Sequence, residues 1–66
     1  MAISLQTQLE CAKREVAMRR RVYPRWVEAD RMTQVKSAQE ISAMEAIVET
    51  LTRLRAAEQP DLLKAG

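Results

Sequence analysis

Only one glycine occurs in this chain of 66 residues, and it is the last residue. The tight turns of β-hairpins usually need residues with positive φ, which glycine adopts most easily. The residues that are abundant instead (alanine, leucine, glutamate, arginine, glutamine and methionine) are good helix formers. We therefore predict an all-α fold.

The chain is short for a protein that folds alone. Its 66 residues make one domain at most, and a chain of this size buries a small fraction of its surface. Cys11 is the only cysteine and histidine is absent, which excludes an intrachain disulfide and the usual zinc sites. We expect a single domain over 1–66, no metal or cofactor, and stabilisation by self-association.

The first part of the chain has the apolar spacing of a helix. Ser4 is a suitable N-cap residue, and apolar residues then recur at helical spacing. These residues are Leu5, Leu9, Ala12 and Val16. Pro24 interrupts the pattern because it cannot donate a backbone hydrogen bond to Arg20. The pattern predicts a helix over about 4–22, a kink or short break at Pro24, and a helical continuation over about 24–30.

The second part of the chain has a longer apolar pattern. Thr33 can cap a helix and Pro60 cannot continue one, so we predict a helix over about 33–59 and a tail over 60–66. The apolar face of this helix comprises Val35, Ala38, Ile41, Met44, Ile47, Val48, Leu51 and Leu54. Two long helices with a short connection near Arg31 form an antiparallel hairpin.

In such a hairpin, residues equally far from the connection face each other. With the connection near Arg31, Arg14 is expected to approach Glu49. In the same way, Arg19 is expected to approach Glu45. The basic half of the first helix would therefore lie beside the acidic middle of the second.

The apolar arc of the second helix is broader than one partner helix covers. A second contact surface is therefore expected, most simply with another copy of the chain. The residues predicted at this oligomer interface are Met44, Ile47, Val48, Leu51 and Leu54. Two hairpins packed in this way would form a four-helix bundle, and the prediction is a dimer or a higher oligomer.

Residues 19–27 combine four arginines with both aromatic residues of the chain. Guanidinium groups beside aromatic rings can bind phosphates, carboxylates or flat ring systems. The residues of this candidate ligand-binding site are Arg19, Arg20, Arg21, Tyr23, Arg25 and Trp26. Alternatively, the arginines pair with glutamates of the second helix and the aromatic rings close the hairpin end. Because consecutive helix residues point about 100° apart, the three adjacent arginines cannot all face one partner.

The composition indicates a protein without catalytic activity. A catalytic cysteine needs a base, and the chain has no histidine to serve Cys11. Glu40, Glu45 and Glu49 lack the Glu-x-x-His spacing of di-metal bundles.

The net charge of +2 is too small to indicate nucleic acid by itself. No apolar stretch approaches the roughly 20 residues needed to cross a membrane, and a free cysteine suits a reducing compartment. We therefore expect a cytoplasmic protein without a membrane partner.

Three short segments together resemble a group of small helical proteins from bacteriophages and prophages. They are RVYPRWV at residues 21–27, RMTQ at residues 31–34, and EI followed by MEAI within residues 40–47. The resemblance covers roughly residues 13–54 and implies a phage accessory protein acting in a bacterial host cell. Members of the group carry a small, flexible residue near the position of Asp30, where this chain has none.

The leading functional hypothesis is a non-enzymatic phage-type accessory protein that binds an anionic partner through the candidate site. That partner would be an anionic small molecule or an acidic protein surface. Narrower forms of the hypothesis are sequestration of a nucleotide-like signal of host defence and inhibition of a host protein. One alternative is direct binding of nucleic acid by the basic half of the first helix. Another is a purely structural role as a helical oligomer.

Overall fold

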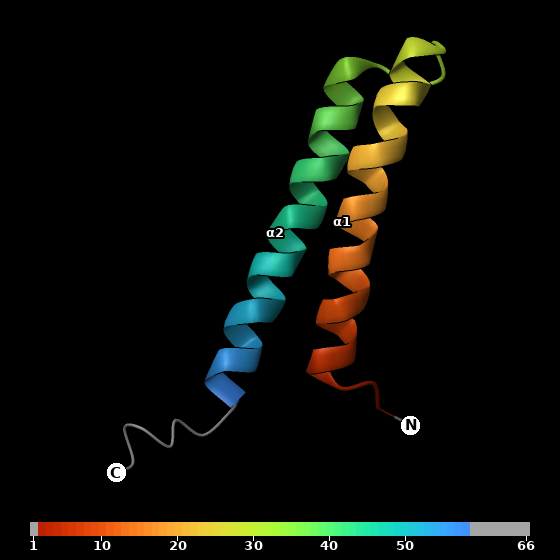
Figure 1. Cartoon of the computed structure of the whole chain (residues 1–66). Coiled ribbons are helices and arrows are strands. Elements are labelled where there is room, and N and C mark those ends of the chain that lie inside the picture. The colour runs from red at the N-terminus through yellow and green to blue at the C-terminus, as the bar shows by residue number, and fades with distance from the viewer. Residues whose placement is uncertain (1, 59–66) are drawn as a thin grey trace.

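The computed structural model describes residues 2–58, which form two helices and no strand (Figure 1). Helix α1 comprises Leu5–Glu28 and helix α2 comprises Gln34–Glu58. The two helices run antiparallel and are joined by residues 29–33 (Figure 1). The prediction of an all-α hairpin is confirmed. The predicted tail over 60–66, and the end of the second helix at residue 59, lie outside the described residues.

Helix α1 is one continuous helix that includes Pro24. Of the predicted kink or short break at Pro24, the continuous helix excludes the break. The physical reason is the packing of side chains next to the proline. The Tyr23 ring is buried and stacks on the ring of Trp26, so side-chain contacts hold this part of the helix although Pro24 leaves the carbonyl of Arg20 without its usual backbone donor. The helix ends at Glu28, two residues earlier than predicted.

The start of each helix has the predicted capping residue. The Ser4 hydroxyl accepts a hydrogen bond from the Thr7 backbone N–H at 3.1 Å. The Thr33 hydroxyl likewise accepts one from the Lys36 backbone N–H at 3.1 Å. Each cap satisfies an N–H group that has no acceptor within the helix.

The connection leaves α1 through a left-handed residue. Asp30 has φ of 58°, and its backbone N–H donates to the Val27 carbonyl at 3.1 Å. The next N–H, that of Arg31, donates to the Trp26 carbonyl at 2.8 Å. This pair of bonds is the Schellman pattern, in which the left-handed position is usually glycine. Asp30 therefore occupies the conformation that a flexible residue would adopt more easily.

The apolar face of α2 departs from the prediction at its first turn. Val35 is 67% exposed, whereas Ser37 is buried. The two residues point about 200° apart on a helix, so only one of them can face α1. Further along, Ile41, Met44, Val48 and Leu51 are half-buried, as expected for the side that faces α1.

The core of the hairpin is a thin layer between the two helices. Its buried apolar side chains are Leu9, Ala12, Val16 and Tyr23, and none of the described side chains is fully enclosed. The shortest dimension of the molecule is 14 Å, close to the roughly 10–12 Å diameter of one helix with its side chains. The radius of gyration is 15.9 Å, compared with about 11 Å for a compact domain of this length. The hairpin is thus one helix thick and elongated.

Candidate anion-binding surface

Arg19 is held by contacts within the hairpin. Its Nε donates to Oε1 of Glu15 at 2.9 Å, and its Nη1 donates to the backbone carbonyl of Glu40 at 2.8 Å. Its guanidinium carbon also lies 5.8 Å from the centre of the Tyr23 ring. The hydrogen bond to Glu15 raises the pKa of Arg19, while burial opposes that shift. Arg19 therefore joins α1 to α2, and its predicted approach to Glu45 is wrong.

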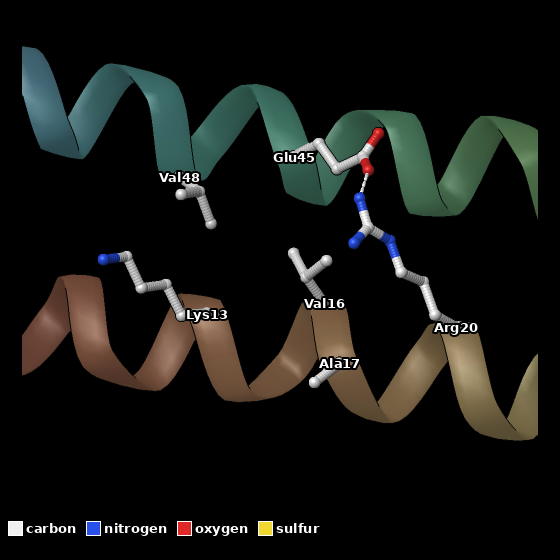
Figure 2. A pocket seen from close by; sticks show the side chains of 6 residues that line it. All are labelled: Lys13, Val16, Ala17, Arg20, Glu45 and Val48. Atoms are coloured by element: carbon white, nitrogen blue, oxygen red, sulfur yellow. Dashed lines mark hydrogen bonds and ion pairs between the residues drawn. The ribbon is translucent and has the colours of Figure 1, made fainter.

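Arg20 reaches across to α2 on the other side of the hairpin. Its guanidinium donates to Glu45 (Figure 2). The pair lies at one end of an open groove of about 410 Å³, whose other lining residues are Lys13, Val16, Ala17 and Val48. Figure 2 shows the Lys13 side chain extending away from the Arg20–Glu45 pair. No acid among residues 2–58 forms an ion pair with Lys13.

Arg21 and Arg25 have a different environment. Both are exposed, and neither forms an ion pair with an acid of the described chain. Arg14 is also exposed and donates to the Cys11 sulfur at 3.2 Å. Spacings of seven and four residues place these three arginines on one side of α1, roughly opposite the buried Val16. We call Arg14, Arg21 and Arg25 the arginine face.

Tyr23 and Trp26 share one side of α1, as their spacing predicts. Their ring centres are 5.4 Å apart and the rings are inclined by 27°. Tyr23 is 8% exposed and Trp26 is 39% exposed. The pair therefore packs against the hairpin near its closed end, and Trp26 keeps part of its ring surface accessible to a partner.

The six predicted ligand-binding residues thus do not form one site. Arg19 and the two aromatic residues lie on one side of the hairpin, Arg20 lies beside the groove on another, and two arginines point away from α2. Sequence reasoning missed Arg14 as a member of the outward group. Its spacing of seven residues from Arg21 was the signal that could have identified it.

The glutamates of α2 are used within the hairpin. Glu40 pairs with Lys36 at 3.5 Å, and Glu49 pairs with Arg53 one turn along its own helix. The predicted pairing of Arg14 with Glu49 is therefore wrong. The order of the helices was predicted correctly, and Glu45 contacts Arg20, the neighbour of the predicted Arg19. The predicted pairs failed because adjacent arginines point to different sides of α1. No cluster of three potential metal ligands occurs within residues 2–58.

The residues predicted at the oligomer interface also divide between two sides. Met44, Ile47 and Leu51 line a second groove of about 470 Å³. Val48 lines the first groove on the opposite side. Leu54 is 51% exposed and follows Ile47 by seven residues, so the two lie on the same side of α2. Four of the five predicted residues therefore belong to one side of the hairpin.

Comparison with protein families, with curated proteins and with solved structures found no match to this chain. Neither helix described by the structure is both long enough and apolar enough to cross a membrane.

Proposed function

We propose that this protein is a non-enzymatic binding protein whose arginine face recognises an acidic surface of another protein. One observation carries the proposal: Arg21 and Arg25 lie one turn apart and are exposed without an acidic partner in the described chain. Two like charges at this spacing repel each other slightly. An external carboxylate would relieve that repulsion and accept charge-assisted hydrogen bonds from both guanidinium groups.

The extent of the arginine face favours a protein partner over a single small anion. Arg14 and Arg25 are separated by roughly 16 Å along the helix axis, so they cannot converge on one phosphate group. Half-buried Met18 lies between them on α1, and the part-exposed ring of Trp26 follows Arg25. Arginine, methionine and aromatic residues are enriched in protein–protein interfaces. This mixture suits an acidic protein surface with apolar patches.

The spacing of these arginines also bears on the other functional hypotheses. Sequestration of a nucleotide-like signal would need several donors around one ligand, whereas these arginines spread along a helix. Nucleic acid would use the spacing, but the net charge of +2 gives little general attraction to a polyanion. A purely structural role accounts for Arg19 and Arg20, which bind α2. It does not explain why Arg21 and Arg25 are exposed without an acidic partner in the described chain. In a phage setting, the proposed partner would be a host protein that the chain inhibits.

The test removes the two outward charges and compares them with two other exposed charges. The wild-type chain, Arg21→Gln/Arg25→Gln and the control Arg31→Gln/Arg53→Gln would be titrated with a glutamate-rich helical peptide. Binding would be followed through the fluorescence of Trp26, the only tryptophan. We expect the first variant to bind at least about tenfold more weakly, because each lost charged hydrogen bond costs about 1.5–3 kcal/mol. The control should bind like the wild type.

A single-stranded oligonucleotide serves as the competing probe. If the wild-type chain binds it better than the peptide, with affinity that falls steeply as salt rises, the nucleic-acid alternative replaces the proposal. Equal weakening of peptide binding in both double variants would show that net charge, rather than the arginine face, is recognised.

A further inference from the structure

The second groove of the hairpin is a largely apolar surface that no other residue among 2–58 covers. We call it the open-end groove, because its lining comes from the start of α1 and the later half of α2. The lining residues are Ile3, Gln8, Cys11, Ala12, Glu15, Met44, Ile47 and Leu51. Glu15 is the only charged residue among them, and its carboxylate already accepts the hydrogen bond from Arg19.

Large apolar side chains stand at the rim of this groove and remain accessible to water. Ile3 is 59% exposed and Ile47 is 47% exposed. Leu54, one turn past Leu51, extends the same surface toward the end of α2. Figure 1 shows the two ribbons farther apart at these ends of the helices than near the connection. Exposed apolar side chains that are contiguous in this way mark contact surfaces more often than isolated ones do.

The exposed area of the whole chain can be compared with the area that one protein interface covers. A compact protein of 7.5 kDa exposes about 4,250 Å². This chain exposes 5399 Å², an excess of roughly 1,150 Å² over that scaling. A standard protein interface takes about 800 Å² from each partner. The excess belongs to the whole elongated chain, and one interface covers an area of the same order.

We propose that the open-end groove is the site of self-association, where a second copy of the chain packs its own open-end groove in a two-fold dimer. An almost uncharged, apolar surface is complementary to itself, and a two-fold contact uses every side chain twice. Two hairpins joined in this way form a four-helix bundle with a core between two layers. The arginine face borders this groove only at Arg14, which donates to the Cys11 sulfur. Arg21 and Arg25, which carry the proposed function, lie more than two turns nearer the connection than Cys11, so the two proposals can be tested separately.

The proposed interface lies on one side of the hairpin only. It includes Ile47 and Leu54 and leaves Val48, on the opposite groove, outside. It also adds residues of α1, chiefly Ala12 and Cys11. If another apolar partner or the chain's own residues 59–66 occupy the groove instead, the wild-type chain has a monomer mass in solution, which distinguishes both from a second copy.

The test places a charge in the groove and, as a control, on a distant apolar residue. Ile47→Glu and Val35→Glu make the same kind of change at exposed branched residues of α2, but Val35 lies on the side away from α1 and the groove. Sedimentation equilibrium should give a dimer mass for the wild-type chain and for Val35→Glu. Ile47→Glu should have a monomer mass at the same concentration, with helix content checked by circular dichroism.

A monomer mass for the wild-type chain at all concentrations would overturn the proposal, as would a dimer mass for Ile47→Glu. If Ile47→Glu loses its helix content, Leu54→Glu provides a second variant on the same side. Loss of helix content in both variants supports the proposal only if dilution of the wild-type chain also reduces helix content. Wild-type helix content that is unchanged on dilution would then overturn it.

Discussion

Asp30 adopts an unfavourable backbone conformation that the connection between the helices requires. It is the one residue among 2–58 other than glycine with positive φ. Its N–H and that of Arg31 close the two hydrogen bonds that end α1. Aspartate tolerates this region better than most residues do, but glycine occupies it without a steric penalty.

Replacing Asp30 with glycine is therefore expected to stabilise the hairpin. The expected gain in the free energy of unfolding is up to about 1 kcal/mol, because removal of strain exceeds the added entropy of the unfolded chain. Urea unfolding followed by circular dichroism at one protein concentration measures it. The control is Ala29→Gly, where φ is −86° and glycine should cost stability. A loss of stability in Asp30→Gly would contradict this account of the connection.

The arginines show what residue type and spacing could and could not predict. Helical geometry alone requires adjacent arginines to diverge, and they do: Arg19 and Arg20 contact α2 while Arg21 points outward. Which glutamate each would meet was not predictable from the chain order. That choice depends on which side of α1 faces α2, and this side is set by packing between the helices rather than by the sequence near each arginine.

At the scale of single elements, local sequence signals predicted where each helix starts. They did not predict that α1 continues through Pro24. Ser4 and Thr33 cap the helices through their own side chains, so a few neighbouring residues were sufficient to predict them. Pro24 is also a local signal, but a helix passes through it. The burial of Tyr23 comes from the hairpin as a whole, and its ring also stacks on Trp26 within α1. Tertiary packing outweighed local preference at that point.

Pro24→Ala is expected to raise the stability of the hairpin by about 1–2 kcal/mol. Alanine restores the backbone hydrogen bond to the Arg20 carbonyl and removes the ring that crowds it. Part of that gain is offset by the greater entropy of the unfolded chain. Chemical denaturation at fixed protein concentration gives the change. Pro24→Gly is the matched variant: it restores the same N–H, and its gain should be smaller by about 1 kcal/mol.

No increase in stability for Pro24→Ala would mean that the proline ring contributes packing that outweighs the lost hydrogen bond. The ring is exposed, which argues against such a contribution. The same variant also tests the continuity of α1, because a helix that broke at residue 24 would gain little from a new N–H there.

At the scale of the whole molecule, the hairpin is thin and elongated. Composition and periodicity predicted the helices and their antiparallel order, because these depend on patterns repeated over many residues. They did not predict which sides of the hairpin remain open. Val35 was expected on the contact face and is exposed, whereas Ser37 is buried. Which side of each helix is buried depends on how the two helices pack against each other. The apolar pattern of one helix does not contain that information.

If two copies associate through the open-end groove, the thermal stability of the chain must depend on its concentration. Association with the folded chain shifts unfolding by mass action. With an unfolding enthalpy of roughly 0.7 kcal/mol per residue in each copy, Tm should rise by about 5 °C for each tenfold increase in concentration. Circular dichroism melts over a dilution series measure this. Ile47→Glu should show no such dependence, and a constant Tm for the wild-type chain would count against association.

The absence of a fully enclosed side chain among the described residues has a consequence for how this sequence can change over time. In a thick globular protein, a central core rejects most substitutions and dominates the pattern of variation. Here even Leu9 and Val16 are one layer from water, so a substitution is resisted mainly by what each side of the hairpin touches. Among homologous sequences, the pattern of conserved positions should therefore follow the contact surfaces of the hairpin more closely than its interior.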